Sequence, residues 1–201
     1  MAKERLKSPR ARLFVALDLP EPVREGIVAW QRAELSDEAL RVVGPENLHI
    51  TLAFLGYVPE KAIGSVAEVV NAVTAEAPRI EFAQEPVGRP KGRPRILALD
   101  AVSEQTVALQ AELEKELVAG RLYKPEKRPF WPHVTVARVR PEKRGSKRPA
   151  RIEKTPRQLP DALLERFFAV GVTLYLSTLR PQGAEYTPLA QVALPADQNE
   201  R

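Results

Sequence analysis

One tetrapeptide pattern occurs twice in the chain, and both copies lie in segments that predict β-strands. Residues 49–52 read HITL and residues 133–136 read HVTV, so the two copies contain both histidines of the 201-residue chain. Side chains alternate between the two faces of a strand. Each histidine and its threonine should therefore point one way, while the apolar residues between them face the core. Two similar strands are expected, each offering one imidazole and one hydroxyl on a common side.

The rest of the chain predicts further short strands separated by helices. Apolar residues at helical spacing over 60–76, and the Ser103 and Gly120 caps, indicate helices. Gly56 reads as the stop signal of the strand that carries the first motif. The expected strands are 12–19, 47–56, 79–83, 95–101, 133–140, 170–177 and 189–194, and the expected helices are 22–35, 60–76 and 103–120. Because hairpin-like connections occur beside helical ones, an α+β fold with antiparallel sheets is favoured over a doubly wound parallel sheet.

The composition limits the chemistry that the chain can perform. It has no cysteine, which removes disulfides, thiolate metal sites and cysteine nucleophiles. Two histidines are too few for a zinc site without carboxylate ligands, since zinc takes three or four protein ligands. Metal chemistry would have to rest on carboxylates, and we expect no metal and no other cofactor.

Charge and hydropathy indicate the setting in which the chain works. The net charge of +5 suggests a polyanionic partner, although it does not separate nucleic acid, nucleotide and membrane surface. No apolar run approaches the ~20 residues of a membrane span, and residues 1–10 lack the apolar run of a signal peptide. We expect a cytoplasmic protein that does not enter a membrane.

Two imidazoles and two hydroxyls facing one another across a cleft would suit a phosphodiester. Hydrolysis of a cyclic phosphate needs a base for the attacking water and an acid for the leaving oxygen, and imidazole can serve as either near neutral pH. Threonine hydroxyls can donate hydrogen bonds to the non-bridging oxygens. A single histidine in a strand is more often structural, but two copies that use every histidine favour catalysis by His49 and His133.

With these motifs the sequence resembles the two-histidine (2H) phosphoesterase superfamily, and within it the RNA 2′,3′-cyclic phosphodiesterases of the LigT/ThpR type, also called RNA 2′,5′-ligases. Further similar segments span nearly the whole chain: RLFVALDLP, ENLHITLAFLG, RPRILALD, RPFWPHVTVAR and TLYLSTLRPQGAEYTPL. The resemblance implies one bilobal, pseudo-symmetric domain over residues 1–201, with two antiparallel sheets facing across a cleft and helices outside. The sequence departs from the family pattern near Ala98, where a bulky aromatic residue is expected in many relatives.

The resemblance also implies a reaction and a role for each motif residue. The activity would be metal-independent cleavage of RNA 2′,3′-cyclic phosphate ends to 2′-phosphate ends, by a protein expected to be a monomer. His49 would be the proton donor to the leaving 3′ oxygen and His133 the proton acceptor that activates water. Thr51 and Thr135 would hold the phosphate. The sequence itself shows two equivalent half-sites and does not decide which histidine is the acid.

Two residues near the second motif are further candidates for substrate binding. Arg138 could neutralise the phosphate, but strict strand alternation places it on the face opposite His133, so a bulge or a strand end would be needed. Trp131 could stack on a base. Its neighbour Phe130 is read as core.

Two basic segments, 89–95 and 140–158, could gather RNA through phosphate contacts. Such charge runs are usually solvated loops, so the longer one is expected to be a basic, mobile loop, and neither is assigned as a site.

Other functions use the same side chains. They are 2′,5′ ligation of RNA, hydrolysis of another cyclic or 2′,5′-linked nucleotide, and, from a different class, a non-catalytic RNA-binding module. The chain has no GxxxxGK[ST] phosphate loop, so ATP-driven ligation is not supported.

Overall fold

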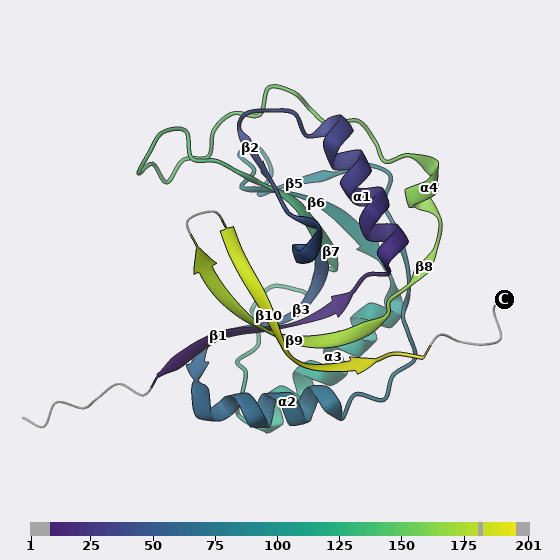
Figure 1. Ribbon diagram of the computed structural model, residues 1–201, viewed down its shortest axis with the longest axis vertical. Coiled ribbons are helices and arrows are strands. Elements are labelled where there is room, and N and C mark those ends of the chain that lie inside the picture. Colours follow the sequence, from purple (N-terminus) through teal and green to yellow (C-terminus); the bar gives the residue numbers. More distant parts are fainter. Residues whose placement is uncertain (1–8, 181–182, 196–201) are drawn as a thin grey trace, which may run out of the picture.

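The described part of the chain, residues 9–180 and 183–195 of the computed structural model, consists of strands and helices in the order shown in Figure 1. Residues 1–8, most of the segment in which no signal peptide is predicted, lie outside it. The strands are β1 (Arg10–Asp18), β2 (Leu40–Val42), β3 (His49–Pro59), β4 (Arg79–Phe82), β5 (Val87–Arg89), β6 (Ile96–Val102), β7 (His133–Val139), β8 (Phe167–Phe168), β9 (Gly171–Arg180) and β10 (Gly183–Ala193). The helices are α1 (Glu21–Glu34), α2 (Ile63–Asn71), α3 (Glu104–Ala119) and α4 (Asp161–Leu164), with short 3-10 turns η1 (Pro45–Asn47) and η2 (Glu60–Ala62).

Every pairing between these strands is antiparallel, which confirms the expected α+β fold. The strand order is β10-β9-β1-β3-β7-β6-β4-β8, with β2 added to β7 and β5 added to β6. The two expected sheets are the two halves of this order. They meet where Ile50 of β3 pairs with Val134 of β7. Because each of these residues sits between the histidine and the threonine of its motif, this pairing brings the two motifs together.

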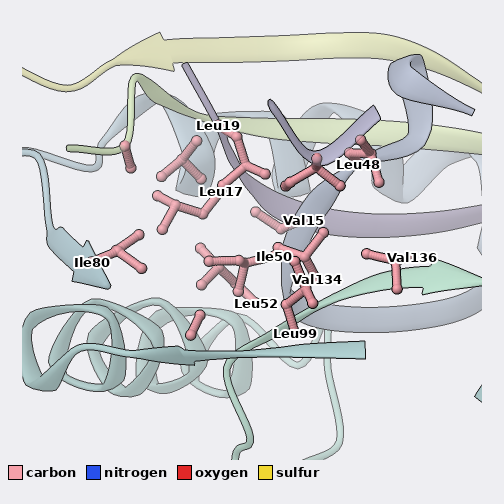
Figure 2. Close-up of a cluster of buried hydrophobic side chains, with 14 of the residues drawn as sticks. Val15, Leu17, Leu19, Leu48, Ile50, Leu52, Ile80, Leu99, Val134 and Val136 are labelled. Atoms are coloured by element: carbon pink, nitrogen blue, oxygen red, sulfur yellow. The ribbon is translucent and has the colours of Figure 1, made fainter. Parts of the chain in front are cut away.

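The core lies behind this junction. Ile50 and Val134 are fully buried, and Figure 2 shows them beside Val15, Leu99 and Val136. Burial of apolar surface at about 25 cal/mol per Å² is the main force that holds such a core. The prediction from the period-two pattern of each motif is therefore confirmed: the apolar residues of the motif are buried in the core, and its histidine and threonine point away from the core.

The helices cover the sheet and fasten its two halves. Gln31, on α1, is buried and donates hydrogen bonds from Nε2 to the carbonyl oxygens of Val43 at 3.1 Å and Val136 at 2.8 Å. At the N-terminus of α3, the Ser103 hydroxyl accepts a hydrogen bond from the Thr106 amide at 3.0 Å, which is the predicted N-cap. Figure 1 shows α2 and α3 lying together on one side of the sheet. Within residues 9–180 and 183–195, no helix is both long and apolar enough to cross a bilayer.

Some boundaries differ from the sequence-based expectation. Gly56 does not end its strand: it adopts a φ of +68°, and β3 continues to Pro59 as the partner of the outer part of β1. The helix expected over 60–76 begins with a 3-10 turn and ends at Asn71. The last strand begins at Gly183, well before residue 189, because β10 pairs along the whole of β9. The strands β2, β5 and β8 were not predicted, since two or three residues are too few to show a period.

The basic segment over 140–158 is tied to the body of the protein at several points. Pro141 and Pro149 form an isolated bridge, and the carboxylate of Asp37 accepts hydrogen bonds from the amides of Glu153 at 2.7 Å and Lys154 at 2.8 Å. These amides also lower the pKa of Asp37, since they stabilise its charged form. The first part of the segment thus folds back on itself at the bridge between Pro141 and Pro149, and its later part is hydrogen-bonded to Asp37.

Candidate active site

Each motif ends in the same irregularity of its strand. In the β1–β3 ladder, Ala16 pairs with Thr51 and Val15 with Ala53, so Leu52 has no partner. A residue without a partner is a β-bulge, which shifts the alternation of side chains by one place. Leu52 and Ala53 are accordingly both buried, and Phe54 joins the motif residues on the cleft side.

The second motif repeats this bulge at Val136. In the β6–β7 ladder, Ala98 pairs with Thr135 and Leu97 with Ala137. Val136 and Ala137 are both buried, and Arg138 therefore points to the same side as Thr135. The bulge that a role for Arg138 requires is present.

Both motifs line a single cleft of about 670 Å³. Its walls include His49, Thr51, His133, Thr135 and Arg138, so the fold brings these five predicted site residues to one place. Further cleft residues come from β1, β2, η1, β3 and the β9–β10 hairpin. Those with charged or aromatic side chains are Arg12, Phe14, Arg41, Glu46, Phe54, Arg180, Glu185 and Tyr186.

The ring of His49 is held by four neighbouring residues. Its Nε2 lies 3.1 Å from the hydroxyl of Thr51, and it also forms a hydrogen bond with the backbone of Asn47. Phe14 stacks on the imidazole with ring centroids 5.0 Å apart, and Tyr186 meets it edge-on at 5.5 Å. The orientation of His49 is therefore set before any ligand arrives.

His133 is fixed in a different way. Its Nδ1 lies 2.7 Å from the carbonyl oxygen of Trp131. A carbonyl only accepts hydrogen bonds, so Nδ1 carries the proton and Nε2 has the free lone pair. The indole of Trp131 stacks on the imidazole with centroids 3.9 Å apart.

Trp131 itself lies behind His133 and is absent from the residues that line the cleft. Its Nε1 donates to Asp100 at 2.6 Å, and the guanidinium of Arg89 covers its ring at 4.9 Å. The imidazole of His133 and the guanidinium of Arg89 both lie against the ring of Trp131. A nucleobase could therefore stack on this ring only by displacing Arg89. In this arrangement the indole and the carbonyl oxygen of Trp131 both contact the ring of His133.

Two aspartates complete the symmetry of the site. Asp18 is the register partner of His49, and Asp100 is the register partner of His133. Both end an Ala-Leu-Asp sequence, at residues 16–18 and 98–100. This second repeat is a sequence signal that the motif reading missed.

Asp18 is buried but fully engaged in hydrogen bonds. It accepts from the hydroxyls of Thr173 at 2.5 Å and Tyr175 at 2.9 Å and from the amide of Gln191 at 3.2 Å. Burial, together with the adjacent Asp18 carboxylate, raises the pKa of Tyr175 to about 12. Tyr175 in turn stacks on Phe14 at 5.2 Å. This network supports the aromatic stack on which His49 rests.

Comparison with known proteins agrees with this geometry. Residues 19–166 match the model of the 2′-5′ RNA ligase superfamily. The chain belongs to this superfamily. The RNA 2′,3′-cyclic phosphodiesterase of Methanocaldococcus jannaschii is 32% identical over 87% of the chain and 96% of its own length, and that of Escherichia coli K12 is 30% identical over 91% and 96%.

Solved structures show the same fold. A protein of Thermus thermophilus superposes with a TM-score of 0.75 at 29% identity, covering 92% of this chain and 99% of its own. E. coli LigT complexed with NADP+ gives 0.73 at 25% identity, covering 94% and 99%. The pseudo-symmetric sheet is thus the fold of this superfamily.

The two histidines of this superfamily member differ in electrostatic environment. Burial, the charge of His133 and the charge of Arg138 lower the pKa of His49 to about 4, against a smaller opposing effect of the bond to Asn47. Burial also lowers the pKa of His133, while the bond to Trp131 and the charge of Asp100 raise it. Both imidazoles of the free site favour the neutral form, and His49 is the harder one to protonate.

No metal centre is apparent in the described parts of the chain, where no group of three or more histidine, cysteine, aspartate or glutamate side chains is placed to hold an ion. The charges that face the cleft belong mainly to arginines.

The lowered pKa of His49 should make folding stability depend on pH. The unfolded chain binds this proton below about pH 6.5 and the folded chain only near pH 4, so stability is lost as pH falls through this window. His49→Phe keeps a ring against Phe14 and removes the titration. We expect the unfolding free energy of the wild type to fall about 1–3 kcal/mol further than that of the variant between pH 6.5 and 4. Denaturant titrations across the range measure this difference, and parallel profiles would mean that His49 titrates normally.

Proposed function

We propose that this chain hydrolyses the 2′,3′-cyclic phosphate ends of RNA to 2′-phosphate ends, with all of residues 1–201 acting as one bilobal domain. The observation that carries the proposal is the convergence of both motifs on one cleft. It is supported by curated relatives that cover most of the chain and are named RNA 2′,3′-cyclic phosphodiesterases. The substrate class is accordingly RNA.

In the proposed reaction, His133 accepts a proton from water through its free Nε2. The water oxygen forms a bond to phosphorus, and the bond between phosphorus and the 3′ oxygen breaks. His49 donates a proton to that leaving oxygen, so the product carries a 2′-phosphate. The hydroxyls of Thr51 and Thr135 donate to the non-bridging oxygens, and Arg138 offsets their negative charge. Proton exchange with solvent then restores both imidazoles.

Substrate binding has a specific part in this scheme. His49 is neutral in the free site at pH 7 because its pKa is about 4. A cyclic phosphate brings a negative charge into the cleft, and a nearby negative charge raises the pKa of an imidazole. Binding therefore makes protonated His49 available. The second candidate is the opposite assignment, in which His133 is the proton donor and His49 the acceptor. It is favoured by the free site, where His49 is the harder imidazole to protonate and Asp100 acts to raise the pKa of His133.

Trp131 enters the proposal as a positioning residue for His133 and not as a base-stacking platform. Its carbonyl fixes the tautomer and its indole supports the ring. The expectation of a monomer and of a cytoplasmic location stays a prediction; gel filtration and cell fractionation test it.

The direct test uses a short RNA that ends in a 2′,3′-cyclic phosphate, with EDTA present. We expect turnover that EDTA does not reduce, because the scheme uses imidazoles in place of a metal. We expect a 2′-phosphate product, identified by ³¹P NMR against synthetic 2′- and 3′-phosphate standards. Tight RNA binding without any turnover would move the chain to the binding-module class. Turnover that EDTA abolishes would refute the metal-free mechanism.

A further inference from the structure

The two halves of the cleft differ at one equivalent position. Phe54 and Arg138 each stand fifth after a motif histidine, each follows a bulge and an alanine, and both line the cleft. The second half thus presents a guanidinium where the first half presents an aromatic ring. A strictly symmetric site would have a second arginine at residue 54.

In the half of the cleft that carries Phe54, a cationic side chain comes from β1, the strand next to β3. The guanidinium of Arg12, on β1, lies over the Phe54 ring at 4.6 Å and donates a hydrogen bond to the hydroxyl of Ser177 on β9. Arg12 and Phe14 are two residues apart on one strand and therefore share its cleft face. One stacking surface and one hydrogen bond hold the group, while a guanidinium has five N–H donors. Among the described residues nothing else accepts a hydrogen bond from this guanidinium, so its remaining donors can bind a ligand.

The charge of Arg12 is not neutralised by any carboxylate in the part of the chain that the structure describes. Across residues 9–180 and 183–195, no carboxylate lies within ion-pair distance of it. Arg180, which lines the same cleft, is in contrast paired with Glu185 at 3.1 Å. A held, unneutralised guanidinium in a cleft wall matches the geometry of a phosphate group.

The position of Arg12 relative to the histidines indicates which phosphate it takes. Phe14 stacks on His49, and Arg12 lies two residues further along β1, about 6.6 Å at 3.3 Å per residue. A displacement of this order separates neighbouring phosphates of a nucleic acid strand. The cyclic phosphate belongs between the two motifs, where Arg138 already supplies a cation. Arg12 lies about that displacement beyond Phe14, the ring that supports His49, and so further along β1 than the residues that face the cyclic phosphate.

We propose that Arg12 binds the phosphodiester that precedes the terminal cyclic phosphate. The inference rests on the proposed function and narrows it: the preferred substrates are oligonucleotides with at least one internal phosphodiester, rather than free cyclic mononucleotides. Phe54 and Ser177 act through Arg12, because they orient its guanidinium.

Three substrates test this subsite. They are adenosine 2′,3′-cyclic phosphate, the dinucleotide ApA with a terminal 2′,3′-cyclic phosphate, and the same dinucleotide with an uncharged methylphosphonate linkage. For the wild type we expect kcat/KM for the charged dinucleotide to exceed that for the neutral one by about tenfold, the effect of one charge-assisted contact. In Arg12→Gln this ratio should fall toward one, and Arg12→Lys should keep part of it.

The matched control is Arg10→Gln. Arg10 lies on the same strand, donates to the backbone carbonyl of Tyr57 and does not line the cleft. It should retain the wild-type ratio, and thermal unfolding of each variant reports its folding. An equal loss on all three substrates in Arg12→Gln would show a structural role, and a wild-type ratio of one would overturn the subsite.

A binding measurement distinguishes failure of the proposed function from failure of the subsite. If the wild type hydrolyses none of the three substrates, calorimetric titration with the same compounds still measures the charge preference and its dependence on Arg12. A preference in binding that Arg12→Gln removes would support the subsite without catalysis. Equal binding of the charged and neutral dinucleotides would overturn it.

Discussion

Alanine at either His49 or His133 is expected to lower kcat/KM for an RNA 2′,3′-cyclic phosphate by about 10²- to 10⁴-fold, the usual contribution of a positioned general acid or base. Each histidine faces the cleft from its own half of the sheet, so neither can take over the proton transfer of the other. The double variant should lose little more than the worse single variant, because groups that act as a unit give strongly non-additive effects. Lys115→Ala, on the exposed face of α3, is the control for a substitution remote from the cleft.

A modified leaving group separates the two roles. In a cyclic substrate with sulfur in place of the 3′ oxygen, the leaving thiolate needs no proton, so loss of the proton donor matters much less. His49→Ala should then recover most of its lost rate, and His133→Ala should not. The opposite pattern would establish His133 as the donor, in agreement with the pKa order of the free site. Recovery by neither variant would argue against paired acid and base catalysis.

The sequence predicts the motif strands because their side chains alternate with a period of two. The residues between each histidine and threonine are fully buried as expected. The bulges at Leu52 and Val136 are not predictable in this way, since a bulge is a property of two strands and depends on the register of the partner. Because of these two bulges, the side chains of Phe54 and Arg138 face the cleft.

Trp131 shows a second limit of sequence reading. An aromatic residue next to a motif histidine is consistent with base stacking, and nothing in its own segment excludes that role. The residues that occupy its edge and its face, Asp100 and Arg89, come from β6 and β5. Long-range contacts of this kind become visible only when the strands are paired. The repeated Ala-Leu-Asp sequence does carry a local signal, because it places an aspartate opposite each histidine.

Replacing Ile50 by alanine is expected to lower the free energy of unfolding by about 2–5 kcal/mol. Ile50 is fully buried, and its pairing with Val134 is where the two halves of the sheet meet. The truncation removes apolar contacts and leaves a cavity at the junction. Ile50→Val should cost only about 0.5–1.5 kcal/mol, because it deletes one methylene group. Denaturant unfolding followed by circular dichroism measures both changes.

Ile50→Ala should also reduce turnover at temperatures where the variant is folded, because Ile50 stands between His49 and Thr51 on β3 and its pairing with Val134 joins the two motifs. Ile80→Ala is the matched control: Ile80 is also buried, on β4, where it pairs with Phe167 away from both motifs. If the two alanine variants lose similar stability but only Ile50→Ala loses kcat, the junction positions the two histidines relative to each other. Equal kcat in the two variants would mean that each half-site keeps its geometry without the packing at Ile50.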